Sequence, residues 1–168
     1  MTTYWKMYLK RTIYECCYIL RIPEPKIKWQ PQNKFPTETL LSAVTGYKGD
    51  LTILLSNQFL YNDMTDKNLA FFIMIVAHEL RHCWQIENDL IKDYDITLAN
   101  SDDKNAYNNQ EVELDAYGFA FAYLRKEYHV EPILPLSSDL NDRKHTQTQR
   151  HYLKGVVLIC FFMNRNRR

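Results

Sequence analysis

Apolar residues recur at three- and four-residue steps over residues 67–88, which is the period of an amphipathic helix. The members of this stripe are Leu69, Phe72, Ile73, Val76, Leu80, Cys83 and Trp84. Three further apolar side chains lie outside the stripe, namely Phe71, Met74 and Ile75. The pattern predicts a helix from Lys67 to about Asn88, capped by Thr65 or Asp66 and covered by other elements on several sides.

Short runs rich in β-branched and apolar residues precede this helix. Leu40–Tyr47 and Leu51–Ser56 flank the turn residues Lys48-Gly49-Asp50, so we expect two strands joined as a hairpin. Lys26–Gln30, which ends before Pro31, is a candidate for a further short strand. These runs predict a small sheet.

Three more helices complete the predicted order. Residues 2–20 alternate aromatic and charged positions at helical spacing, and prolines follow this segment closely. A polar loop over residues 89–108 leads to a helix from about Asn109 to Tyr128. A proline-containing connection, Glu131 to Asp142, precedes a last helix at about Thr146–Asn164. We therefore expect an α+β fold, with residues 1–168 forming one domain.

Composition and charge narrow the classes of protein. Apolar residues make up 46% of the 168-residue chain, so it can bury a core. The formal net charge of +1 does not indicate a nucleic-acid partner. The longest apolar runs, Leu69–Ala77 and Val156–Met163, are too short to cross a membrane. The start of the chain has no signal-peptide pattern, so we expect a cytoplasmic protein. Its four cysteines, Cys16, Cys17, Cys83 and Cys160, should then be reduced thiols. We also expect the chain to be a monomer.

The predicted long helix contains His78-Glu79-Leu80-Arg81-His82. Residues four apart on a helix share a face, with Cβ atoms about 5–6 Å apart, so both imidazoles can bind one Zn²⁺. Glu79 points beside such a metal and can act as a general base toward a zinc-activated water. Because the histidines face away from the apolar stripe, one side of this helix can join the core while the other offers ligands.

A catalytic zinc needs a third protein ligand and an open position for water. His129, His145 and His151 do not follow at the short spacing of the metzincins, so an acid from the next helix is the better candidate. This helix offers three acids, Glu111, Glu113 and Asp115. Glu113 shares a helix face with Ala116, Tyr117, Ala120 and Leu124. Glu111 shares one with Asp115, Gly118 and Ala122. Helical geometry alone leaves the choice between the two glutamates open.

The HExxH stretch with Gln85, followed by Glu113-Leu114-Asp115-Ala116 and Phe119-Ala120, resembles the gluzincin metallopeptidases. The likeness extends over about residues 40–125 and is strongest to the small minimal gluzincins and the ImmA/IrrE-like metallopeptidases. It implies zinc as cofactor, held by His78, His82 and Glu113. The alternative ligand, Glu111, fits a thermolysin-like frame in which Asp115 would support a histidine ligand.

The resemblance also implies a zincin-like arrangement and an activity. In such enzymes an edge strand pairs with an extended substrate peptide, here Leu40–Tyr47 or Leu51–Ser56. Four side chains are candidates for stabilising the oxyanion: Tyr107, Tyr117, His145 and His151. We therefore expect a zinc-dependent endopeptidase acting on protein or peptide substrates, with Glu79 as general base. Two alternatives are a zinc-binding regulatory or toxin–antitoxin-type protein with little turnover and a metal-free helical interaction module.

Overall fold

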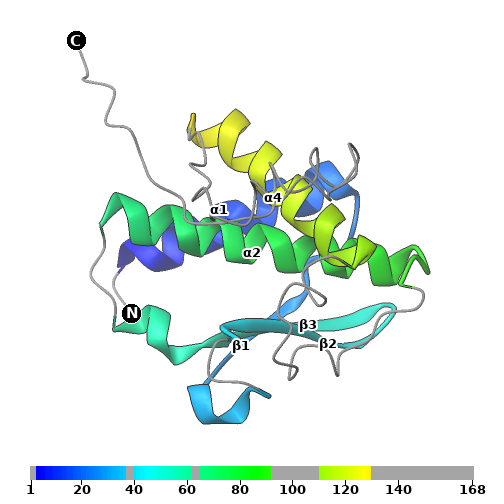
Figure 1. Cartoon of the computed structure of the whole chain (residues 1–168), viewed down its shortest axis with the longest axis horizontal. Helices are drawn as coiled ribbons and strands as arrows, with labels where there is room; N and C mark the ends of the chain where they lie inside the picture. Colours follow the sequence, from blue (N-terminus) through cyan, green and yellow to red (C-terminus); the bar gives the residue numbers. More distant parts are fainter. Residues whose placement is uncertain (1–2, 37–39, 62–64, 92–109, 130–168) are drawn as a thin grey trace, which may run out of the picture.

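A computed structural model describes residues 3–36, 40–61, 65–91 and 110–129 (Figure 1). The helices are α1 (Thr3–Leu20), α2 (Asp66–Glu87) and α4 (Glu111–Tyr128). The strands are β1 (Lys26–Gln30), β2 (Ser42–Tyr47) and β3 (Asp50–Ser56). Two short 3-10 helices, Gln32–Lys34 and Asn57–Leu60, lie beside the strands. The described part of the chain is therefore an α+β fold with a three-stranded sheet.

The sheet has the strand order β1-β3-β2, with β1 parallel and β2 antiparallel to β3. Lys48 and Gly49 form the hairpin turn between β2 and β3, where Gly49 has a positive φ that favours glycine. The backbone N–H of Ser56 donates to the carbonyl of Leu41 at 2.8 Å, which extends the ladder just beyond the strand. β3 is thus paired on both sides, and β2 lies at an edge of the sheet.

Helix α2 lies between the sheet and the other two described helices (Figure 1). Its N-terminus is capped by Thr65, whose hydroxyl accepts from the backbone N–H of Asn68 at 3.2 Å. Phe72 is fully buried and meets the rings of Trp5 from α1 and Phe59 at centroid distances of 4.8 and 5.2 Å. Neighbours on several sides explain why the first half of α2 is apolar almost all round.

The predicted N-terminal helix, the sheet and the two later helices are confirmed, with ends shifted by only one or two residues. Cys16, Cys17 and Cys83 are buried free thiols, as expected. In the described part of the chain, no helix is long and apolar enough to cross a membrane. The predicted helix at Thr146–Asn164, the connection before it, nearly all of the loop at residues 89–108 and Cys160 lie outside the described residues.

Candidate metal centre

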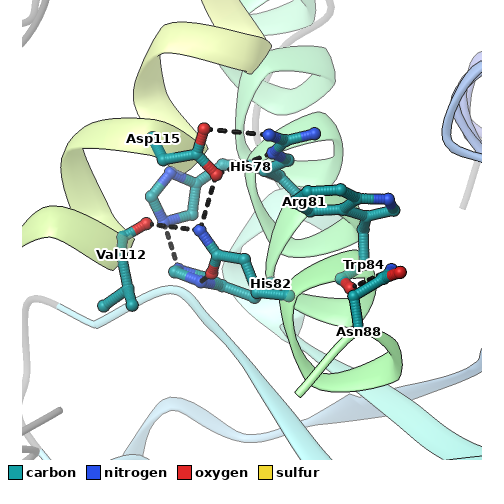
Figure 2. Close-up of polar contacts among 8 residues, drawn as sticks. His78, Arg81, His82, Trp84, Asn88, Val112 and Asp115 are labelled. Atoms are coloured by element: carbon teal, nitrogen blue, oxygen red, sulfur yellow. Dashed lines mark hydrogen bonds and ion pairs between the residues drawn. The ribbon is translucent and has the colours of Figure 1, made fainter. Parts of the chain in front are cut away.

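Three side chains from α2 and α4 converge at one point. His78 and His82 project from α2 toward α4 (Figure 2), and Glu113 reaches them from α4. The Nε2 atoms of the two histidines lie 2.9 Å apart. One carboxylate oxygen of Glu113 lies 3.2 Å from Nε2 of His78, and the other lies 3.6 Å from Nε2 of His82. All three residues are buried, and together they could hold a metal ion.

The phase of α4 decides which glutamate takes part. Glu113 is only 1% exposed and lies on the buried face with Ala116 and Ala120, while Glu111 is exposed. The two alanines are completely buried, and their small side chains let α4 approach α2 closely. The structure therefore brings together His78, His82 and Glu113, and it leaves Glu111 outside the group.

The donor set and its spacing suit a tetrahedral ion. Bonds of about 2.0–2.1 Å place neighbouring ligands of a tetrahedral zinc about 3.3 Å apart. The two Nε2 atoms lie 2.9 Å apart, and the nearer Glu113 oxygen of each histidine lies at 3.2 or 3.6 Å, so the separations fall on either side of that value. Two imidazole nitrogens with one carboxylate form a set that zinc accepts readily. The residues present therefore fit a zinc ion.

Electrostatics link the three side chains without a metal. Burial works against the charge of Glu113, but hydrogen bonds with His78 and His82 outweigh it, so its pKa lies well below the usual range. Burial also lowers the pKa of His82, yet the hydrogen bond to Glu113 and the charges of Glu113 and Glu79 raise it to about 9. A proton shared within this group thus offsets the buried negative charge, and a metal ion can take over that role.

Gln85 orients the imidazole of His82. Its Oε1 lies 2.7 Å from Nδ1 of His82, and its amide nitrogen donates to the carbonyl of Val112 at 2.9 Å and to Asp115 at 2.8 Å. The two acceptors identify the nitrogen of the amide, so its oxygen must accept from Nδ1–H of His82. With Nδ1 held by Gln85, Nε2 is the ring atom that faces Glu113, and a metal ion can replace its proton there.

Asp115 joins this network to the surface of α2. Arg81 donates two hydrogen bonds to its carboxylate, at 2.7 and 2.9 Å (Figure 2). The guanidinium also lies 3.7 Å from the ring centroid of Trp84. Burial raises the pKa of Asp115, but the hydrogen bonds from Arg81 and Gln85 prevail and lower it. Asp115 therefore supports His82 indirectly, through Gln85, whereas the thermolysin-like frame predicted that Asp115 itself would support a histidine.

Glu79 is 5% exposed and accepts a hydrogen bond from the hydroxyl of Ser42 on β2 at 2.6 Å. Sequence reasoning missed Ser42, because a serine at the start of a strand carries no motif.

Among the four oxyanion candidates, Tyr117 lies against His78, with ring centroids 4.2 Å apart. Tyr107, His145 and His151 lie outside the described residues.

The chain matches no protein-family model, and searches of curated proteins and solved structures also found no match. The class of protein therefore follows from the residues themselves. They define an α+β fold in which two helices carry a buried His-His-Glu group that could hold a metal ion.

Proposed function

We propose that the chain is a zinc-dependent peptidase in which His78, His82 and Glu113 hold the ion. The observation that carries this proposal is the convergence of two Nε2 atoms and one carboxylate in a buried position. The described residues supply three such ligands and no fourth. Three protein ligands with an open position are typical of catalytic zinc, whereas structural sites are closed by four. Zinc bound there would supply Lewis-acid chemistry toward a carbonyl oxygen and a water molecule.

Glu79 is the residue proposed to move the proton. It follows His78 directly on α2 and is not one of the three grouped ligands, and its charge contributes to raising the pKa of His82. It accepts a proton from the attacking water as the new C–O bond forms. It then donates that proton to the amide nitrogen as the C–N bond breaks, so the products are an acid and an amine.

The sheet supports a peptide as the substrate. β2 is an edge strand, and its first residue contacts Glu79, so this strand begins beside the residue proposed to move the proton. An extended peptide adds to such an edge through main-chain hydrogen bonds. β3 already pairs with β1 and β2. Of the two strands predicted to accept the substrate, Leu40–Tyr47 therefore has the edge that can do so.

Two measurements on purified protein test the proposal. Protein prepared without chelators is expected to contain about one zinc per chain, measured by mass spectrometry of the metals. Incubation with a library of proteome-derived peptides is expected to give new termini that Glu79→Gln protein does not produce. Lack of stoichiometric zinc would rule out the proposal. Zinc without cleavage would favour a zinc-binding regulatory or interaction protein.

A further inference from the structure

Ser42 and Glu79 form a buried contact between the edge strand and α2. The hydroxyl of Ser42 donates to Oε1 of Glu79 at 2.6 Å, and the two residues are 4% and 5% exposed. Within the described part of the chain, this is the one hydrogen bond that the carboxylate receives. A buried carboxylate gains substantially from such a charge-assisted bond. The bond therefore restrains one oxygen of Glu79 and leaves Oε2 available.

The main chain of Ser42 points in another direction. In an antiparallel ladder, the N–H and C=O of one residue point to the same side, and the side alternates along the strand. The carbonyl of Leu41 accepts from the N–H of Ser56, the last residue of β3, at 2.8 Å, so the main-chain groups of Leu41 face β3. The main-chain groups of Ser42 and Val44 consequently face away from β3, toward the outer edge of the sheet. In the described residues, no strand covers this edge.

The other end of β2, at the hairpin turn, is also held against the end of α2. The N–H of Gly49, in the hairpin turn, donates to Glu87 near the end of α2 at 2.8 Å. Lys48 forms an exposed ion pair with Asp89 at 2.6 Å. Contacts at both ends of β2 keep the strand in a defined position along α2. The distance between the outer edge and Glu79 is therefore set by the fold.

We propose that Ser42 is a positioning residue for Glu79, and that it links the substrate-binding edge to the proton-transfer group. This inference rests on the proposed peptidase function. The Ser42 side chain restrains Oε1 of Glu79, so that Oε2 faces the attacking water. The Ser42 main chain lies at the edge where the substrate backbone adds. One residue thus sets both the position of the peptide and the direction of the carboxylate.

The kinetic consequence is a loss of turnover with little loss of binding. Ser42→Ala keeps the backbone that contacts the peptide but frees the carboxylate to rotate. Because small misplacements of a reacting group cost up to about 100-fold in rate, we expect kcat to fall about tenfold or more. KM and zinc content should stay within about twofold of wild type, since the edge and the ligands are intact. Ser42→Thr, which keeps the hydroxyl, should restore most of kcat.

The experiment measures kcat and KM on one quenched fluorogenic peptide, chosen from the sequences cleaved in the library. Ser56→Ala is the matched control, because it removes another buried serine hydroxyl, which donates to Gln32. Ser42 pairs with Leu55, so the next side chain along the chain, that of Ser56, points to the face of the sheet opposite Ser42. This control should lower thermal stability without changing kcat. An unchanged kcat in Ser42→Ala, or a loss that Thr does not restore, would overturn the proposal.

A thermal-unfolding cycle tests the contact independently of activity. It compares metal-free wild type, Ser42→Ala, Glu79→Ala and the double variant. We expect clearly non-additive shifts in Tm, since residues in direct contact couple. Additive shifts would overturn the Ser42 inference even in an active enzyme. Coupled shifts in the metal-free cycle, together with stoichiometric zinc binding but no cleavage of any library peptide, would instead overturn the peptidase function, and the positioning role with it.

Discussion

Gln85 accepts a hydrogen bond from Nδ1 of His82 at 2.7 Å, one helical turn away on α2. The same amide donates to the carbonyl of Val112 on α4, so the orientation of His82 depends on the packing of the two helices. This arrangement makes Gln85 part of the candidate metal centre, although it is not one of the three residues that could bind an ion.

Replacing Gln85 by Met is therefore expected to weaken zinc binding. Met has a similar volume, but its thioether is only a weak acceptor, so the imidazole loses the bond that fixes its tautomer and orientation. Loss of such a supporting bond typically costs about 10–100-fold in metal affinity. Competition with a chromophoric chelator measures the change. Gln58→Met, at an exposed position, is the control and should bind zinc as wild type does. Equal affinities in the two variants would contradict this role.

Removal of the two glutamates of α4 should have unequal effects. Glu113→Ala deletes a buried group that lies 3.2 Å from His78, so zinc affinity should fall by more than about 100-fold, beyond the effect of a supporting residue. Glu111→Ala alters an exposed side chain and should leave the affinity within about twofold. The same chelator competition compares them. A larger effect at Glu111 would place the third ligand there instead.

Glu79→Gln separates metal binding from catalysis. The amide has the shape of the carboxylate but cannot accept a proton at neutral pH, so we expect full zinc content with kcat lowered by about 10²–10⁴-fold. Single-turnover cleavage of a library-derived peptide, together with metal analysis of the same sample, provides the measurement. Cleavage at the wild-type rate would show that another group carries the proton.

Val44→Pro tests the outer edge of β2. The N–H of Val44 points away from β3, so proline removes a donor that the sheet does not use. We expect near-native thermal stability but a rise in KM of about 2–10-fold, which corresponds to one lost main-chain hydrogen bond. Ala43→Pro is the contrasting control, because its N–H faces β3 and its loss should lower Tm. Unchanged KM in a folded Val44→Pro protein would exclude peptide addition at this position.

The metal-free protein should become less stable as the pH rises above neutrality. The pKa of His82 is raised from 6.5 to about 9 in the folded protein, mainly because its proton bonds Glu113 in spite of burial. A raised pKa means that the folded state binds this proton more tightly. The resulting stabilisation is complete below about pH 6.5 and is lost as the pH approaches 9.

Urea unfolding at pH 6.5 and pH 9, in the presence of a chelator, measures this dependence. His82→Gln protein lacks the titrating group and should show a flatter profile. Zinc-loaded protein should also lack this contribution, because the metal replaces the proton on Nε2. Equal slopes in metal-free wild type and His82→Gln would contradict the assignment to His82.

Local chemistry made much of this fold predictable. The 3.6-residue period of apolar side chains located α2, and the turn residues around Gly49 located the hairpin. Four-residue spacing placed His78 and His82 on one helix face. Each of these features depends on neighbours within one or two turns of the chain, so a single sequence contains the necessary information.

The contacts between elements required the tertiary structure. Both glutamates of α4 obey helical geometry equally well, and only the packing of Ala116 and Ala120 against α2 turns Glu113 inward. Ser42 reaches Glu79 across 37 positions of sequence, and Arg81 reaches Asp115 across 34. No periodicity encodes such pairs.

The sequence by itself therefore determined which residues could form a metal centre and on which helices they lie. The tertiary structure decided which acid joins the histidines, which residues support them and which strand borders them. The physical reason is that helix phase and turn chemistry are local properties of the chain. The docking of α4 and β2 on α2 instead depends on how all the buried surfaces fit together at once.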